Sequence, residues 1–208
     1  MNIPIIYEDQ WLVILNKPSG LLTIPTPKNE SRTLTSILND DIKEKGLGYR
    51  LHPCHRLDRA TSGLIIYAKG KSSQKQVMDL FRQKKIKKTY IAFVQGEMPK
   101  SGGVINFPVE GKPAQTNYRV IEKRQDYSIV EAAPQTGRTN QIRIHFKGLG
   151  CPILGEDVYA FRRDFKIKAK RLCLHAQTLE FKHPVTQKGL CLDAPLPEEL
   201  KKFLESHK

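Results

Sequence analysis

The chain has 208 residues, of which 39% are hydrophobic and 27% are charged, and this predicts one domain with a core of its own. The composition excludes collagen-like, coiled-coil and wholly disordered proteins, which need glycine periodicity, long heptads or a depleted apolar content. It also excludes a membrane-spanning helix, because no apolar run approaches the ~20 residues that a bilayer requires. Lysine and arginine number 35 against 21 aspartates and glutamates, so the formal net charge is +14. Such a surplus favours polyanionic partners: nucleic acid, an anionic membrane surface or acidic substrates.

Many of the basic residues fall into two clusters. The first basic cluster consists of Lys69, Lys71, Lys75, Arg82, Lys84, Lys85, Lys87 and Lys88. The second basic cluster consists of Arg162, Arg163, Lys166, Lys168, Lys170 and Arg171. Either cluster alone is equally well explained as a solvated surface. Together with the net charge, they favour contact with phosphates.

The N-terminal segment 1–17 carries acidic residues and lacks the basic-then-apolar order of a signal peptide. The cysteines are scattered, with no C-x-x-C pair, so we expect a reducing cytoplasm: Cys54, Cys151, Cys173 and Cys191. The run His52, Cys54, His55 has no second ligand pair downstream and is a poor zinc pattern, so no metal site is expected.

In chain order, the β-rich runs 3–7 and 11–16 flank a polar tripeptide and predict a hairpin. Apolar residues at helical spacing predict a helix over 33–45, with Gly46 as its stop. Further strands are expected over 64–68, 89–95, 116–122, 127–133 and 172–181. One further helix is expected to begin at Ser72 or Ser73. A short last helix is expected after Pro197, with this proline at a position in its first turn.

The segment 139–149 fits both a strand and a helix. We favour the helix, because Thr139 can cap it and Gly148 and Gly150 can end it. Strands then outnumber helices and do not alternate regularly with them, which predicts an α+β fold or a mixed sheet. No repeat or linker interrupts the chain, so a single domain over residues 1–208 is expected.

The densest chemistry lies in the segment 51–69, where Asp58 stands between Arg56 and Arg59 just before a buried strand. A structural ion pair explains this pattern. The alternative is an aspartate held ionised by the guanidinium groups and ready to act as nucleophile or base. Thr61 and Ser62 can bind its carboxylate or shape the turn.

Two further segments are candidates. Arg138 and Arg143 lie at the start of the helix expected over 139–149, where basic side chains and orphan N–H groups suit an anion. Surface arginines on an amphipathic helix are the alternative. Tyr90 opens a strand after the basic pair Lys87 and Lys88, and its local pattern is that of a core tyrosine.

At this point the motifs show a family resemblance. HRLDRATSG around Asp58, QTGRTNQIR around Arg143 and GCPILGEDVY resemble motifs of the RluA family of pseudouridine synthases. NKPSGLL, KKTYIAFVQG and LCLHAQTLEFKHP resemble that family's first, strand and last motifs, in the family's order and over almost the whole chain. GKPAQTNY and LLTIP further resemble the small branch without an N-terminal S4-type domain. The resemblance implies the pseudouridine synthase fold: a mixed, mostly antiparallel central sheet with flanking helices and an active-site cleft across the sheet.

The resemblance also implies roles for single residues. Asp58 matches the essential aspartate, Arg143 the arginine that pairs with it, and Tyr90 the tyrosine that stacks on the target base. Arg56 matches the arginine that helps to displace the base. The residues expected to bind RNA are Arg56, Arg59, Arg138, Lys84, Lys85, Lys87 and Lys88.

Two positions depart from the family pattern. Asn140 stands where members usually have histidine, and Glu156 stands where they have aspartate. Glu156 keeps the negative charge and is expected to keep a structural contact.

The implied reaction breaks the N1–C1′ bond of uridine, rotates the base and rejoins it through C5. It involves no redox change, so no cofactor is expected. The target base must leave the stack, which requires contacts with flanking phosphates of ribosomal or transfer RNA. The protein is expected to be a cytoplasmic monomer. The alternatives are an RNA-binding module without turnover and a glycosidase or nucleosidase, although the latter classes typically need two acidic groups. A DNA-binding regulator is disfavoured, since no helix-turn-helix or zinc pattern occurs.

Overall fold

The structure is a computed structural model that describes residues 3–28, 30–161, 163 and 165–207. Its internal contacts divide the chain into two compact units. Unit 1 comprises Met1–Lys87 and Thr178–Ala194, and unit 2 comprises Lys88–Gln177 and Pro195–Lys208. The single domain over residues 1–208 stays a prediction.

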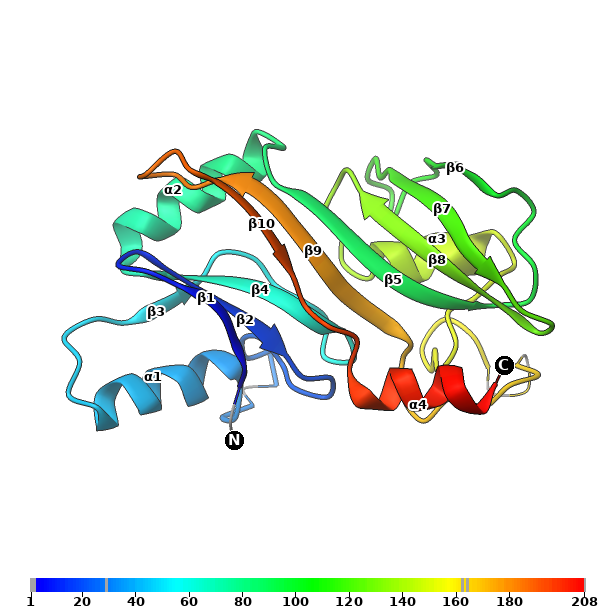
Figure 1. Ribbon diagram of the computed structural model, residues 1–208, viewed down its shortest axis with the longest axis horizontal. Coiled ribbons are helices and arrows are strands. Elements are labelled where there is room, and N and C mark those ends of the chain that lie inside the picture. The colour runs from blue at the N-terminus through cyan, green and yellow to red at the C-terminus, as the bar shows by residue number, and fades with distance from the viewer. Residues whose placement is uncertain (1–2, 29, 162, 164, 208) are drawn as a thin grey trace. The chain divides into compact units, whose positions relative to one another are not determined.

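The secondary structure follows the order expected from the sequence, with additional short strands (Figure 1). The helices are α1 (Leu34–Glu44), α2 (Lys71–Arg82), α3 (Gln141–Gly148) and α4 (Glu198–Ser206). The strands are β1 (Ile5–Glu8), β2 (Leu12–Lys17), β3 (Leu51–Pro53), β4 (Ser62–Lys69), β5 (Lys87–Gln95), β6 (Gly102–Ile105), β7 (Thr116–Lys123), β8 (Tyr127–Pro134), β9 (Leu174–Lys182) and β10 (Gly189–Asp193).

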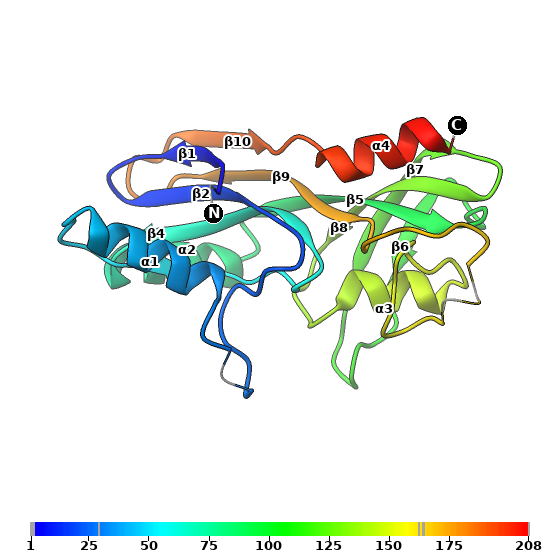
Figure 2. The ribbon, with the colours of Figure 1, turned by 90° about the horizontal axis from the view of Figure 1, so that it is seen from below.

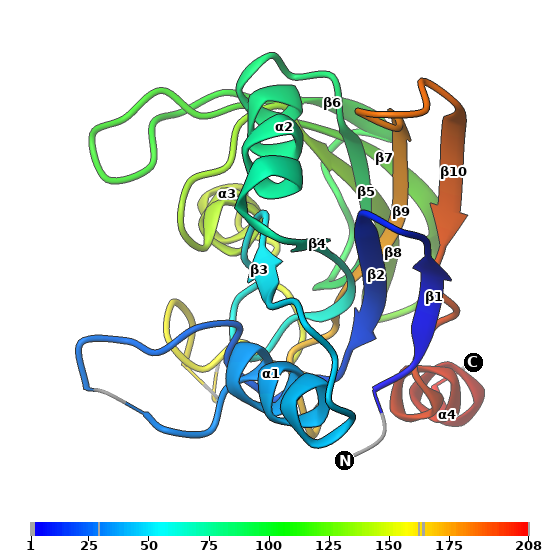
Figure 3. The same cartoon turned by 90° about the vertical axis from the view of Figure 1, so that its left-hand side faces the viewer.

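In unit 1 the strand order is β1-β2-β4-β9, with β10 paired to β9 and β3 paired to β4. The predicted hairpin is confirmed: β1 and β2 are antiparallel, and the Asp9 carboxylate shapes their turn by accepting the N–H groups of Trp11 and Leu12 at 2.8 Å each. Helices α1 and α2 lie on the same side of β2 and β4 (Figure 3). The core of unit 1 therefore forms around the continuous apolar runs of β2 and β4.

The helix expected over 33–45 is also confirmed. Thr33 caps α1 by accepting the N–H of Ser36 at 3.1 Å, and the Ser36 hydroxyl in turn accepts the N–H of Thr33 at 2.9 Å. This reciprocal arrangement satisfies two donors that a helix start leaves open. Gly46 follows with φ +65°, a left-handed conformation that glycine adopts without strain, and the helix ends there.

In unit 2 the strand order is β9-β5-β8-β7-β6, and α3 and α4 cover opposite faces of β5, β7 and β8 (Figure 2). On the α4 side, the ring of Phe203 packs 5.8 Å from Phe93 and 5.6 Å from Tyr127. On the α3 side, Phe146 meets the edge of Tyr118 at 6.1 Å. Side chains on the two faces of these strands thus hold one helix each: β5 and β8 contact α4, and β7 contacts α3.

The segment 139–149 forms a helix, as favoured, but its predicted cap is wrong. The N-cap is Asn140, with φ 54°, and not Thr139. Asparagine tolerates this left-handed conformation, whereas β-branched threonine does not. The N-cap side chain makes no capping hydrogen bond, and the Gln141 side chain instead closes the turn before the helix, because its Oε1 accepts the N–H of Arg138 at 3.0 Å. Pro197 likewise occupies the N-cap of α4 and not a position in its first turn.

The sequence pattern does not predict β3, β6 and β10. Each has three to five residues, and β6 begins with two glycines while β3 ends with a proline. Strands of this length and composition have little β-propensity of their own, and they form because they pair with longer neighbouring strands. The predicted α+β class, with a mixed and mostly antiparallel sheet and flanking helices, is confirmed. The cleft across the sheet stays a prediction. In the described part of the chain, no helix has the length and apolar content needed to cross a bilayer.

His145 attaches α3 to its surroundings, and we expect it to make the stability of unit 2 sensitive to pH. Its fully buried ring binds the Thr116 hydroxyl through Nδ1 at 3.0 Å and the Phe107 carbonyl through Nε2 at 3.1 Å. Burial lowers the pKa of His145, and the hydrogen bond to Phe107 opposes this only in part. A folded-state pKa below the unfolded value means that the neutral ring stabilises the fold above about pH 6.5 and that this contribution is lost as the pH falls below it.

We therefore expect the free energy of unfolding to decrease between pH 7.5 and pH 5, and this slope to be shallower in His145→Gln. Glutamine can donate to Phe107 and accept from Thr116 but does not titrate. Urea unfolding at several pH values measures the slope, with His207→Gln as the control histidine. An unchanged slope in His145→Gln would contradict the assignment.

Candidate active site

Asp58 lies in unit 1, half-buried in the loop between β3 and β4. Its carbonyl accepts the N–H of Thr61 at 3.1 Å, which closes a turn immediately before β4. Thr61 was expected either to bind the Asp58 carboxylate or to shape the turn, and its backbone N–H does the second. The Thr61 hydroxyl is buried and has no hydrogen-bond partner within the described residues.

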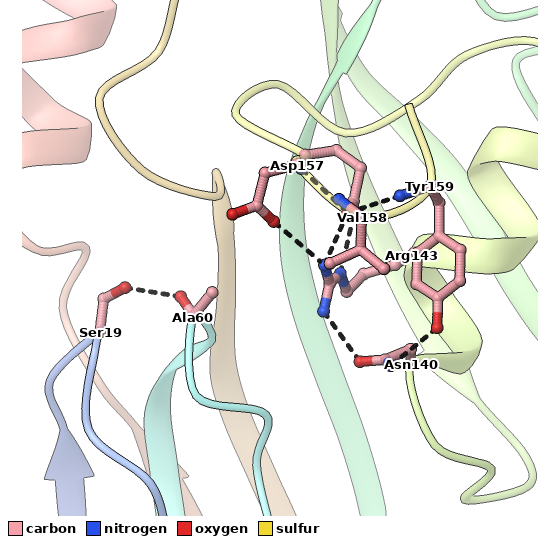
Figure 4. Close-up of polar contacts among 8 residues, drawn as sticks. Ser19, Ala60, Asn140, Arg143, Asp157, Val158 and Tyr159 are labelled. Atoms are coloured by element: carbon pink, nitrogen blue, oxygen red, sulfur yellow. Dashed lines mark hydrogen bonds and ion pairs between the residues drawn. The ribbon is translucent and has the colours of Figure 1, made fainter. Parts of the chain in front are cut away.

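The segment 17–20 forms hydrogen bonds with the residues that follow Asp58. The Ser19 hydroxyl donates to the Ala60 carbonyl at 2.6 Å (Figure 4), and the Gly20 N–H donates to the Arg59 carbonyl at 2.8 Å. The fully buried ammonium of Lys17 donates to the same Arg59 carbonyl at 3.3 Å and to the carbonyls of Pro18 and Leu21 at 2.9 and 2.8 Å. These bonds satisfy a buried charge and fix the backbone on one side of Asp58.

The two arginines that flank Asp58 are both exposed but differ in their contacts. Arg59 donates from Nε to the Gly20 carbonyl at 3.1 Å, so its side chain also takes part in the hydrogen bonds with the segment 17–20. Arg56 is an exposed side chain two residues before Asp58. Contact of either arginine with RNA stays a prediction.

Tyr90 lies in unit 2, on β5, opposite Ala132 of β8, and is 9% exposed. The four lysines expected to bind RNA just before it fall into two groups. Lys84, Lys85 and Lys87 are exposed, whereas Lys88 is half-buried and burial lowers its pKa. The exposed lysines are therefore better placed to contact a phosphate.

Arg143 is held in unit 2 by a bidentate ion pair with Glu156, and Figure 4 shows its contact with Asn140. Its Nε and Nη2 donate to the two carboxylate oxygens of Glu156 at 2.7 and 2.6 Å. Its Nη1 donates to Oδ1 of Asn140 at 2.9 Å, and the Asn140 amide in turn donates to the Tyr159 hydroxyl at 2.8 Å. The guanidinium also lies 5.3 Å from the centroid of the Tyr159 ring. Two-point pairing fixes the plane of the guanidinium as well as its position.

Glu156 keeps the structural contact that was expected of it, and it does more. Its Oε1 also accepts the N–H groups of Asp157, Val158 and Tyr159 at 3.1, 2.9 and 3.2 Å. Burial alone raises the pKa of Glu156, but the hydrogen bonds from Arg143 and from these N–H groups outweigh it and hold the pKa below its ordinary value. The carboxylate is therefore ionised beside Arg143.

The turn that presents Glu156 depends on Gly155. Its φ is +77°, and a Cβ atom there would lie 2.0 Å from the Arg171 carbonyl oxygen. Only glycine fits this close backbone approach. Asn140, the other departure from the family pattern, has a defined role here, because its amide joins Arg143 to Tyr159.

Arg138 lies in the turn before α3 and Arg143 in the first turn of that helix, and the two have different surroundings. Arg143 is 6% exposed and is engaged by Glu156, whereas Arg138 is exposed and donates from Nε to the Pro113 carbonyl at 3.0 Å. The pairing of Arg143 with Asp58, which the resemblance implies, stays a prediction.

Unit 1 also carries a surface hollow of about 820 Å³ between α2 and the β9–β10 hairpin. It is lined by Gln76, Asp79, Leu80, Lys85, Lys182, Pro184, Val185 and Gln187. Lys182, which neither basic cluster includes, thus joins Lys85 of the first basic cluster. Lys87 pairs with Glu180 at 3.0 Å, but both side chains are exposed, so the pair adds little stability.

The second basic cluster is less uniform than its sequence suggests. Arg162 lies outside the described residues. Lys166 pairs with Asp126 at 3.5 Å, and the half-buried Arg171 donates to the carbonyls of Leu172 and Leu174 at 3.1 and 3.4 Å. Arg171 therefore stabilises the chain leading into β9.

Within the run His52, Cys54, His55, the cysteine belongs to the core of unit 1 and both histidines are half-buried. His55 accepts the N–H of Ile66 through Nε2 at 3.1 Å, and burial raises the pKa of the Cys54 thiol to about 12. In the described ranges of the chain, no group of three or more His, Cys, Asp or Glu residues is arranged to hold a metal ion.

Comparison with known proteins relates the chain to one family. A family model described as RNA pseudouridylate synthase matches residues 11–147. The chain is 38% identical over 207 residues to the dual-specificity RNA pseudouridine synthase RluA of Pasteurella multocida (strain Pm70), with 92% of each chain covered. It is 37% identical over 220 residues to the ribosomal large subunit pseudouridine synthase C of Vibrio vulnificus (strain CMCP6), covering 97% of this chain and 68% of that one.

Solved structures agree with the sequence comparison. The human RNA Pseudouridylate Synthase Domain Containing 4 superposes with a TM-score of 0.80 at 28% identity, covering 97% of this chain and 92% of that one. The human RNA Pseudouridylate Synthase Domain Containing 1 shares the fold, with a TM-score of 0.75 at 23% identity and coverage of 99% and 94%.

Proposed function

Because the chain belongs to the RNA pseudouridylate synthase family, we propose that it converts specific uridines of structured ribosomal or transfer RNA into pseudouridine, with Asp58 as its essential carboxylate. The observation that carries the proposal is the match to a dual-specificity RNA pseudouridine synthase over 92% of both chains. Enzymes with this activity are isomerases.

The chemistry assigns a task to each candidate residue. The glycosidic N1–C1′ bond breaks, the uracil turns, and a C5–C1′ bond forms while the C5 proton is lost and N1 gains a proton. Asp58 supplies the ionised carboxylate beside the sugar, Arg143 places it, and Tyr90 holds the detached base against its ring. The rigid Glu156 pairing supports the role of Arg143, because a guanidinium fixed in advance need not reorganise during the reaction.

Exposed lysines provide the path for the RNA backbone. A flipped nucleotide leaves its neighbours to be held through their phosphates, and a net charge of +14 suits this task. In unit 1, Lys84, Lys85 and Lys87 are exposed, and Lys182 joins Lys85 in the surface hollow. We assign these side chains to contacts with RNA phosphates.

Replacement of Lys84, Lys85 and Lys87 by glutamine is expected to weaken RNA binding and to flatten its salt dependence. Each lost phosphate contact lowers the slope of log K against log salt by roughly 0.7 on single-stranded segments, so the slope falls by up to about 2. Tyr90→Leu is expected to leave this slope unchanged while slowing turnover, because stacking releases no counterions. Filter binding at several salt concentrations measures the affinities and slopes, and tritium release from uridine C5 measures turnover.

The matched comparison is the triple glutamine variant of Lys166, Lys168 and Lys170, which removes the same charge from the second basic cluster. If only this second variant loses affinity and slope, the RNA enters along 162–171. Equal losses in both variants would indicate a general effect of net charge.

The function itself is tested in two steps. Purified protein is incubated with transcripts labelled with tritium at uridine C5, since isomerisation releases that tritium. Chemical mapping of pseudouridine in total RNA with and without the gene then identifies the modified uridine. RNA binding without tritium release from any ribosomal or transfer RNA would instead identify a binding module without turnover.

A further inference from the structure

We propose that Thr23 is a positioning residue for Asp58, and that its buried hydroxyl fixes the backbone on which the essential carboxylate stands. The inference rests on the proposed role of Asp58. It concerns Leu57, the residue before Asp58, whereas the segment 17–20 holds the residues after Asp58.

Thr23 forms two hydrogen bonds with Leu57, the residue immediately before Asp58. Its Oγ1 donates to the Leu57 carbonyl at 3.0 Å and accepts the Leu57 N–H at 3.3 Å. Thr23 is 2% exposed and Leu57 is 5% exposed, so water does not compete for these groups. One hydroxyl thus satisfies both backbone polar groups of Leu57 and restricts the rotation of the peptide that leads into Asp58.

Thr23 is itself anchored to the core of unit 1. Its carbonyl accepts the N–H of Thr35 at 3.2 Å and the Thr35 hydroxyl at 2.7 Å. The Thr35 hydroxyl lies 2.9 Å from the hydroxyl of Tyr67, a fully buried residue of β4. Since the single hydrogen of Thr35 is directed at Thr23, Tyr67 must be the donor to Thr35.

A continuous chain of hydrogen bonds therefore runs from β4, through the first turn of α1, to the loop of Asp58. Adjacent to it, the Leu34 N–H donates to the Leu22 carbonyl at 2.8 Å, so the start of α1 holds the segment at two consecutive residues. On the other side of Asp58, Ser19 and Gly20 hold Ala60 and Arg59. The backbone is thus held both before and after Asp58, and Thr23 holds it through both backbone polar groups of Leu57.

The consequence for catalysis follows from geometry. A displacement of about 1 Å at a reacting group can cost roughly 100-fold in rate, whereas RNA affinity depends mainly on phosphate contacts elsewhere. Loss of the Thr23 hydroxyl should therefore slow the chemical step and leave RNA binding unchanged. A residue needed only for stability would show no such separation.

The test compares Thr23→Val, which keeps the shape and removes the hydroxyl, with Thr23→Ser, which keeps the hydroxyl. Single-turnover pseudouridine formation is measured at saturating transcript, together with RNA affinity and thermal unfolding. We expect a rate roughly 10- to 100-fold lower for Thr23→Val, a nearly normal rate for Thr23→Ser, and affinities within about twofold of the wild type. Ser128→Ala is the control, because it removes another buried hydroxyl bond, to the Gly96 carbonyl at 2.9 Å.

The outcomes separate this inference from the proposed function. If the wild-type chain modifies no RNA, the proposed function fails. If the wild type is active and Thr23→Val matches its rate, or Thr23→Ser is as slow as Thr23→Val, only the positioning role fails. Should Thr23→Val not fold, Thr35→Val tests the next bond in the chain. A several-fold slower step in Thr35→Val at unchanged affinity supports the inference, and a wild-type rate overturns it.

Discussion

Asp58→Asn is expected to abolish pseudouridine formation while RNA affinity stays within a few fold of the wild-type value. The amide has the shape of the carboxylate but can act neither as nucleophile nor as base. The backbone contacts of the neighbouring residues, such as the Thr61 N–H to the Asp58 carbonyl at 3.1 Å, do not involve the changed group. Removal of a negative charge that faces phosphates should not weaken binding. Tritium release and filter binding on the same transcript measure the two effects.

The matched control is Asp40→Asn, which makes the same change at an exposed position of α1 and should keep full activity. Turnover of Asp58→Asn above about 1% of the wild-type rate would contradict the assignment, because loss of an essential covalent or proton-transfer group costs far more. Loss of RNA binding in this variant would instead indicate a damaged fold, which urea unfolding detects.

Long elements with a clear period could be predicted from the sequence, because local pattern decides them. The continuous apolar runs of β2 and β4 and the capped, amphipathic α1 are examples. Details decided by tertiary contacts could not. The strand β3 exists because β4 supplies its hydrogen bonds. The start of α3 is set by the left-handed Asn140, and the turn before it is closed by the Gln141 side chain.

The candidate site shows the same division. The Asp58 segment is recognisable because its chemistry is concentrated within a few consecutive residues. The partner of Arg143 is Glu156, thirteen residues away, and the partner of Leu57 is Thr23, thirty-four residues away. No periodicity connects such pairs. The NKPSGLL and GCPILGEDVY motifs were the available signal, since both contain residues that support others: Lys17 holds the Arg59 carbonyl, and Glu156 holds Arg143.

Arg143→Met is expected to destabilise the protein by about 3–5 kcal/mol and to reduce turnover even where the variant is folded. Glu156 is 2% exposed, and its charge would remain buried without the guanidinium that compensates it. The N–H groups of residues 157–159 would still bind the carboxylate but carry no full charge. Because a domain of this kind has about 5–15 kcal/mol of stability, the free energy of unfolding is measured by urea titration at low temperature. Arg119→Met is the control, since its pair with Glu131 at 3.3 Å involves an exposed arginine and should contribute little.

A double-mutant cycle then identifies which carboxylate depends on Arg143. Combined with Glu156→Gln, Arg143→Met should cost at least about 1 kcal/mol less than the sum of the single changes, because the two side chains share two hydrogen bonds. The same cycle with Asp58→Asn tests the pairing that the family resemblance implies, and there too non-additive free energies of unfolding are expected. Plain additivity with Glu156→Gln would contradict the bidentate pair. Additivity with Asp58→Asn alone would leave Arg143 as a structural partner of Glu156 and remove it from the catalytic set.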